Sequence, residues 1–232
     1  MPLAIHFFNH LNTMKLRYGS RTMSATGRGA DVASNCAALH HALMEDQLEP
    51  DIIRSPEEVA RRALALFSIV GIALGAPRSD VIDWLDRTGL RTDLAPSEER
   101  FIATPTPSER EIIDAGWLSE RLVVLCWALC EVGELPRPDE QCDTGSFQEI
   151  LPPFADVDTT SFIAGAKLRS DGDLIAKADE ILRQHWEARN AKLTGKMPRI
   201  PVNIGIAQER HHAINWVIGY DGLPWDEVTR DT

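Results

Sequence analysis

The segment WLSERLVVLCWALCEVG, residues 117–133, holds nine consecutive apolar positions, from Leu122 to Cys130. A helix that is apolar on every side has to be buried inside the protein. We therefore predict a central helix here, closed by Gly133. The segment that leads into this helix begins at Ser108-Glu109-Arg110-Glu111, where Ser108 and Glu111 have the spacing of a capping box.

Helix start and stop signals follow one another along the rest of the chain. Ser55-Pro56-Glu57-Glu58 is another capping box with proline at the first helical position. The apolar run after it, residues 63–76, is shorter than the roughly 20 residues that cross a bilayer, so it predicts a buried helix. Further helices are expected from Ser79 to Gly89, from Ser97 to the TPTP sequence at 104–107, at 146–154, at 160–168, from Asp171 or Asp173 to Gly195, and at 203–218.

These signals predict an all-α fold class. Apart from AIHFF near the start, no stretch alternates apolar and polar residues, and no internal repeat is visible. With 44% hydrophobic residues, 232 residues are enough for a sizeable core. We expect residues 31–232 to form a single compact domain of about eight helices around the buried central helix. Residues 1–30 are expected to be a poorly ordered or extended segment, irregular or a short strand.

The charge distribution limits the classes of partner. The formal net charge is −11, and all 35 acidic residues lie beyond residue 30. Such a body repels phosphate backbones and anionic lipid, so we expect neither nucleic acid nor membrane as a partner. The same charge favours a basic protein partner. The oligomeric state is left open by the sequence.

The cysteines and the N-terminus favour a cytoplasmic location. Cys36, Cys126, Cys130 and Cys142 form no CxxC pair and no zinc-binding ladder. No basic region followed by a long apolar stretch marks a secretory signal, so a reducing cytoplasm is the expected compartment. The first 30 residues, which are free of acids, allow two alternatives: an organellar transit peptide, or an extension upstream of a true translation start at Met14 or Met23.

Four polar residues occupy helix positions that should face the core. With 100° per residue, His185 and Arg189 fall in the middle of the apolar arc of their helix, and Arg210 falls in the middle of another. Glu120 lies on the central helix and is the expected acid for at least one arginine, because a buried guanidinium needs a partner. One interpretation is an internal salt-bridge network that ties three helices together. The other is a site where the arginines bind an anionic ligand and His185 moves a proton.

Metal binding has only weak candidates, Glu209 and His212. They have the Glu-x-x-His spacing of di-iron bundles, but no second Glu-x-x-His occurs in the chain. On a helix the neighbours His211 and His212 diverge by 100°, with His211 at the edge of the apolar arc and His212 on the polar side. We therefore expect no metal and no cofactor.

No reaction motif points to an enzyme. The sequence contains no GxGxxG, no Walker-type loop, no GxSxG elbow and no HExxH. The expected function is that of a non-catalytic helical protein that acts through protein–protein interaction, as immunity or adaptor proteins do. The alternative is an enzyme or small-molecule sensor that binds an anionic ligand at the Glu120, His185, Arg189 and Arg210 cluster.

Four segments, residues 54–66, 117–143, 173–195 and 209–232, resemble a family of bacterial proteins, domain of unknown function 4272. The closing pattern is the most distinctive: Glu-Arg-His, then Ala-Ile-Asn-Trp, then Trp-Asp-x-Val-x-x-Asp-Thr. The family has no established activity, so the resemblance implies a bacterial, soluble, mostly helical protein but no catalytic residues. Its recognisable segments contain Glu120, Trp127, His185, Trp186, Glu209, Arg210, Trp216, Trp225, Asp226 and Asp231.

Overall fold

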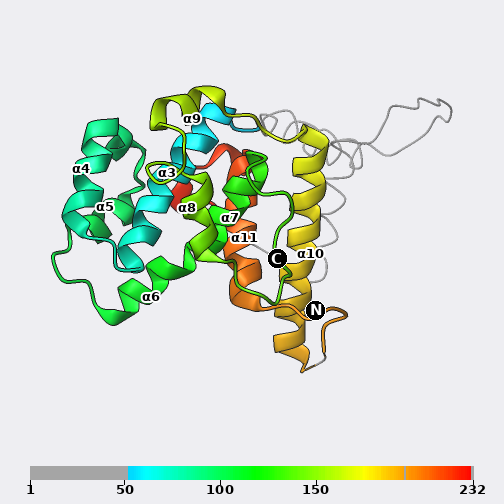
Figure 1. The fold of residues 1–232 in the computed structure, drawn as a ribbon. Coiled ribbons are helices and arrows are strands. Elements are labelled where there is room, and N and C mark those ends of the chain that lie inside the picture. Colours follow the sequence, from blue (N-terminus) through cyan, green and yellow to red (C-terminus); the bar gives the residue numbers. More distant parts are fainter. Residues whose placement is uncertain (1–51, 196, 231–232) are drawn as a thin grey trace, which may run out of the picture. The chain divides into compact units, whose positions relative to one another are not determined.

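The computed structural model describes residues 52–195 and 197–230. These residues form α-helices joined by loops and 3-10 turns, and no strand occurs among them, so the predicted all-α fold class is confirmed (Figure 1). They belong to a compact unit that spans residues 51–232. The predictions for residues 1–30, for Cys36 and for the domain boundary after residue 30 lie outside the described residues.

The order of elements follows the predicted pattern closely. The α-helices are α3 (Pro56–Ala73), α4 (Arg78–Thr88), α5 (Pro96–Ala103), α6 (Glu109–Trp117), α7 (Ser119–Ala128), α8 (Phe147–Ile150), α9 (Thr159–Gly165), α10 (Asp171–Thr194) and α11 (Ile204–Val217). The 3-10 turns are η1 (Leu90–Asp93), η2 (Thr144–Ser146), η3 (Tyr220–Gly222) and η4 (Trp225–Glu227).

Helix α7 is the predicted central helix. It packs between α3 and α11, while α10 covers the far side of α11 and the α4–α6 group lies beyond α3 (Figure 1). Every residue of α7 except Arg121 is buried. The run of apolar positions therefore identified the centre of the molecule correctly, because a helix with neighbours on both sides has no face left for solvent.

The predicted end of the central helix at Gly133 is wrong. Helix α7 stops at Ala128, and Cys130 takes a left-handed conformation with φ of 65°. The backbone amide of Glu131 then donates to the Cys126 carbonyl at 2.9 Å. Arg169 closes the turn from outside, because its Nε donates to the Trp127 carbonyl and its Nη2 donates to the carbonyls of Val132 and Gly133. The apolar run gave no sign of this turn, since a cysteine rarely takes a positive φ.

Most predicted caps are confirmed. Ser55 and Ser108 each form a capping box with a glutamate three residues later, and Gly89 and Gly195 end α4 and α10 in the left-handed conformation. Two starts are shifted: α4 begins at Arg78 rather than Ser79, and α5 at Pro96 rather than Ser97. In both cases a neighbouring proline accompanies the helix start, a position where its missing N–H costs nothing.

The C-terminal turns of α10 are more exposed than the periodicity predicts. His185 is buried as expected, but Arg189 is exposed and Leu193 keeps 74% of its surface accessible. The prediction that Arg189 faces the core is therefore wrong. The buried positions of α10 end at Ala188, one residue before Arg189.

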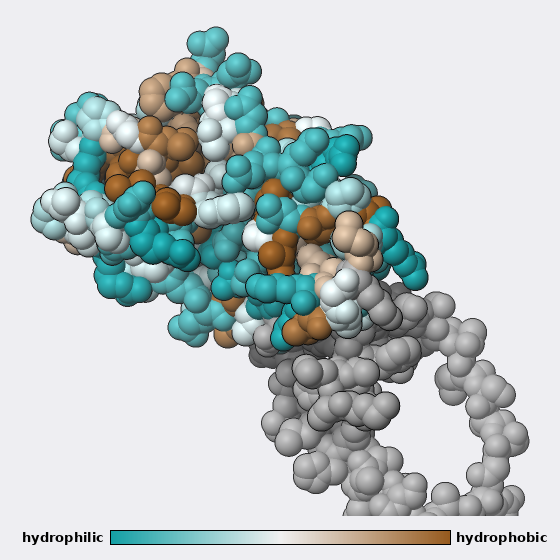
Figure 2. Space-filling model, turned by 90° about the horizontal axis from the view of Figure 1, so that it is seen from below, coloured by the Kyte–Doolittle hydropathy of each residue, from teal (hydrophilic) through white to brown (hydrophobic). Residues whose placement is uncertain are grey.

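The face of the described residues that Figure 2 shows is mostly hydrophilic, with apolar patches between the polar areas. Within that part of the chain, no helix combines the length and the apolar character that a membrane span requires.

Candidate functional site

Two members of the predicted polar cluster, Glu120 and Arg210, form a buried ion pair. Nε and Nη2 of Arg210 both lie 2.9 Å from Oε2 of Glu120. The other carboxylate oxygen of Glu120 accepts a hydrogen bond from the backbone amide of Cys142 at 2.7 Å. The expectation that Glu120 supplies the acid for a buried arginine is confirmed.

Arg210 also fixes the loop that follows α7. Its Nη1 donates to the carbonyls of Pro136 and Arg137 at 2.6 and 3.3 Å, and its Nη2 donates to the Glu140 carbonyl at 3.1 Å. Each guanidinium nitrogen therefore has an acceptor within the protein. This is the arrangement expected of a structural network, because the donors that an anionic ligand needs are already used.

His185 lies apart from this ion pair, against another histidine. Its Nδ1 is 3.0 Å from Nδ1 of His211, so one ring donates and the other accepts across the contact between α10 and α11. Burial, and then the charges of Arg189 and Arg230, lower the pKa of His185 to about 4. A neutral His185 at physiological pH follows. The cluster thus separates into an ion pair and a histidine pair, and its binding of an anionic ligand stays a prediction.

The weak metal candidates, Glu209 and His212, have different partners. Glu209 forms ion pairs with Arg121 and, at 3.2 Å, with Arg230. His212 is 3% exposed and packs edge-on against Trp225, so its predicted position on the polar side is wrong. The C-terminal turns cover that side of α11, which periodicity within one helix cannot reveal.

The imidazole of His212 is held in its neutral form. Burial, and then the charges of Arg121 and Arg230, lower its pKa to about 2, although a hydrogen bond with the Trp225 backbone opposes the shift. Among the residues that the structure describes, its Nε2 has no hydrogen-bond partner. Across residues 52–195 and 197–230, no three His, Cys, Asp or Glu side chains come together as metal ligands.

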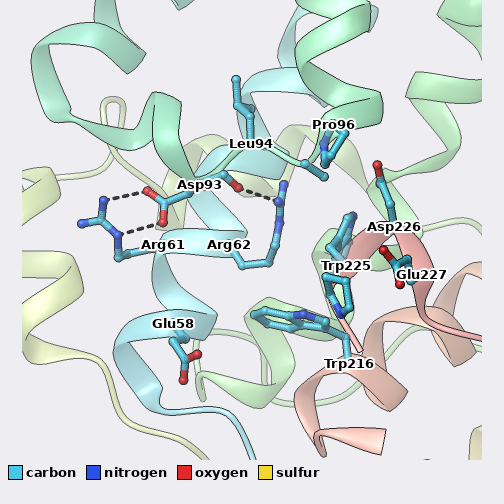
Figure 3. A pocket seen from close by; sticks show the side chains of 12 residues that line it. Glu58, Arg61, Arg62, Asp93, Leu94, Pro96, Trp216, Trp225, Asp226 and Glu227 are labelled. Atoms are coloured by element: carbon cyan, nitrogen blue, oxygen red, sulfur yellow. Dashed lines mark hydrogen bonds and ion pairs between the residues drawn. The ribbon is translucent and has the colours of Figure 1, made fainter. Parts of the chain in front are cut away.

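A pocket of about 350 Å³ opens between α3, the η1–α5 junction and the C-terminal turns (Figure 3). Its apolar lining consists of Leu94, Ala95, Pro96, Trp216, Pro224 and Trp225. Its charged lining consists of Glu58, Arg61, Arg62, Asp93, Asp226 and Glu227. None of the four residues of the predicted polar cluster contributes to it.

The two arginines of the pocket are held by the protein itself. Arg61 makes a two-pronged contact with the Asp93 carboxylate, at 3.0 and 2.6 Å (Figure 3). Arg62 donates to the Asp93 carbonyl at 2.7 Å and pairs with Glu98 at 2.6 Å. Its guanidinium also lies 4.7 Å from the ring centre of Trp225. Arg62 and Trp225 therefore form one wall of the pocket, although Nε of Arg62 has no hydrogen-bond partner in the described part of the chain.

The four carboxylates of the pocket differ in what they contact. Asp93 binds Arg61, and Asp226 accepts hydrogen bonds from the backbone amide and the hydroxyl of Ser97 at 2.8 and 2.7 Å. Glu58 accepts from the backbone amide of its capping box. The side chain of Glu227 is exposed, and its carboxylate makes no hydrogen bond or ion pair with any residue that the structure describes. One carboxylate of the four is thus available to a ligand.

The C-terminal turns that carry Trp225 are anchored at several points. The Arg54 backbone amide donates to the Val217 carbonyl at 2.9 Å, and Nη2 of Arg54 donates to the Leu223 carbonyl at 2.8 Å. Gly219 has φ of 71°, and a Cβ placed there would lie 1.9 Å from the Ile52 carbonyl oxygen. Only glycine allows this close approach of the two backbones.

Sequence reasoning missed the pocket because its walls come from distant segments. Trp216, Trp225 and Asp226 were noted only for the family resemblance. Arg62 carried a usable signal, because it lies in the strongly apolar helix α3 and is 4% exposed. The test of helical phase that singled out Arg210 would also have singled out Arg62.

Comparisons with known proteins identify a family but no characterised relative. No curated protein and no solved structure matches the chain. The family model described as "Domain of unknown function (DUF4272)" matches residues 35–228, which is most of the sequence. The protein belongs to this family.

Proposed function

We propose that this protein is a non-catalytic interaction domain that binds a basic partner protein at the Trp216–Trp225 pocket. The observation that carries the proposal is the composition of the pocket lining, which combines two tryptophans and two prolines with four carboxylates. Tryptophan-lined concavities are frequent anchor sites in protein interfaces. The carboxylates outnumber the two arginines, so the pocket favours positive charge.

The charge of the whole chain supports the same class of partner. A net charge of −11 attracts basic proteins over a distance and raises the rate of their encounter. The alternative, an enzyme or sensor for an anionic ligand, has less support, because Glu120 and Arg210 bind each other and the neighbouring backbone. Reaction with an anionic substrate would also require that substrate to approach an acidic surface.

We also propose that the protein works in the reducing cytoplasm of a bacterial cell. Cys126, Cys130 and Cys142 are unpaired, as cysteines are in such a compartment. The bacterial origin is supported by the family resemblance alone.

The test compares pocket and control variants in capture experiments. Glu227→Lys reverses the available charge in the pocket, whereas Glu134→Lys makes the same charge change on the exposed loop after α7. Proteins retained from a native lysate at low salt are identified, purified and tested individually. A basic protein bound by the wild type and by Glu134→Lys, but lost with Glu227→Lys and at high salt, is the expected result. Retention of no stoichiometric protein, or binding unaffected by Glu227→Lys, would overturn the proposal.

A further inference from the structure

We infer that the pocket recognises one arginine side chain, presented by the basic partner, and that Glu227 is the residue that selects it. The inference rests on the proposed function and names the chemical group that the pocket accepts. It follows from the pairing of the carboxylates, the apolar walls and the way the protein already packs its own guanidinium groups.

The pairing of the carboxylates limits the ligand to one positive group. Asp93, Asp226 and Glu58 bind Arg61, Ser97 and the α3 cap respectively, so a ligand cation would have to break these contacts to use them. Glu227 makes no such contact within the described residues, and Figure 3 draws its carboxylate beside Asp226 and Trp225 without a hydrogen bond. The single carboxylate without such a contact therefore suits a ligand with a single cation.

The lining and volume of the pocket suit a long basic side chain. Leu94, Pro96 and Trp216 provide apolar surface in the same pocket as the carboxylates. Lysine and arginine bury the methylene groups of their stems against such surface and keep the charged end near polar groups. A volume of about 350 Å³ leaves room for such a stem.

Arginine fits these walls better than lysine. The protein itself places Arg62 4.7 Å from the ring of Trp225 and Arg54 5.1 Å from the ring of Trp216. A guanidinium is planar and weakly hydrated, so it loses less on leaving water and can donate two parallel hydrogen bonds to one carboxylate. An ammonium group is more strongly hydrated and contacts a carboxylate as a point charge.

Three short peptides test the inference directly. The full chain, labelled with ¹⁵N, is titrated with acetyl-Ala-Ala-X-Ala-Ala-amide, where X is arginine, lysine or citrulline, and the indole signals of Trp216 and Trp225 are followed. The expected order of affinity is arginine, then lysine about 3-fold weaker, with no saturable shift from the uncharged citrulline peptide. Equal or tighter binding of the lysine peptide, or equal binding of the citrulline peptide, would overturn the choice of arginine.

Variants separate the role of Glu227 from general charge. Glu227→Gln keeps the size of the side chain and is expected to lower the affinity for the arginine peptide about 10-fold. Glu134→Gln is expected to leave this affinity unchanged. Equal affinity in the wild type and Glu227→Gln would overturn the inference. The peptide titration needs no natural partner, so its outcome is independent of the capture experiment. A failed titration with successful capture would overturn the choice of arginine but not the proposed function. Successful titration with failed capture would do the reverse.

Discussion

Glu120 and Arg210 are 90 positions apart in the chain, yet their side chains meet at 2.9 Å with 1% and 2% of their surfaces exposed. The contact joins the central helix to α11, and the further bonds of Arg210 hold the loop after α7 against both. A substitution that removes the charge of either residue leaves the opposite charge of the other buried without an ion-pair partner.

Arg210→Met is therefore expected to lower the free energy of unfolding by about 3–5 kcal/mol. Urea denaturation measures the change. Arg137→Met removes an exposed arginine from the same region and should have little effect. The double variant Glu120→Gln, Arg210→Met should recover part of the loss, since no buried charge remains. A loss for Arg210→Met no larger than that for Arg137→Met would contradict the structural role of the pair.

Gly219→Ala and Gly222→Ala form a matched pair. Both glycines have positive φ, but a Cβ meets the Ile52 carbonyl oxygen only at Gly219, while it meets open space at Gly222. Gly222→Ala should cost about 1–2 kcal/mol from backbone strain alone. Gly219→Ala should cost about 1–3 kcal/mol more because two backbones must separate. Thermal denaturation of both variants measures the two losses of stability. Equal losses for Gly219→Ala and Gly222→Ala would show that the contact between Gly219 and Ile52 is loose.

The buried histidines make stability depend on pH. The pKa of His185 is lowered to about 4 and that of His212 to about 2, so the unfolded chain takes up protons before the folded one does. The free energy of unfolding is therefore unaffected by these two histidines above about pH 7. It declines as the pH falls below about 6.5, the ordinary pKa of histidine in the unfolded chain. Between pH 6 and pH 5 each histidine should lower the free energy of unfolding by about 1 kcal/mol per pH unit.

His212→Gln should reduce this slope by the share of one histidine. Arg121, Arg230 and Arg62 surround the His212 ring, and they would remain in the variant. Urea titrations at pH 7, 6 and 5 measure the slope. The same slope in the wild type and in His212→Gln would show that His212 does not titrate on unfolding.

Cysteine labelling should follow exposure. Cys130 is exposed, whereas burial raises the pKa of the Cys126 thiol and raises that of Cys142 to about 12. Iodoacetamide at pH 8 should therefore alkylate Cys130 first among these three, because the thiolate is the reactive form. Peptide mapping by mass spectrometry gives the rates. In urea the three should react alike, and equally fast labelling of Cys142 in the native protein would contradict its burial.

Features that depend on local sequence could be predicted well. The capping boxes at Ser55 and Ser108 and the glycine ends at Gly89 and Gly195 are set by a few neighbouring residues, and the structure contains all four. The burial of α7 followed from its nine apolar positions. Helical phase also located Arg210, which lies near the middle of α11, and its partner Glu120 was expected from the central helix, where it lies in the first turn of α7.

Features that depend on packing between distant segments could not be predicted. The burial of His212 needs Trp225 to fold back over α11, and the exposure of Arg189 depends on where the contacts of α10 end. The pocket joins Arg62 of α3 to Trp225, and no periodicity within one helix reports such a neighbour. These arrangements follow from the tertiary contacts rather than from local pattern.

The pocket takes one wall from α3 and another from the turns that hold Trp225, near opposite ends of the described residues. During synthesis α3 emerges from the ribosome more than 150 residues before Trp225, so the pocket stays incomplete on a nascent chain until Trp225 has also emerged. A partner that recognises this pocket would distinguish chains in which both walls have been made from shorter nascent chains.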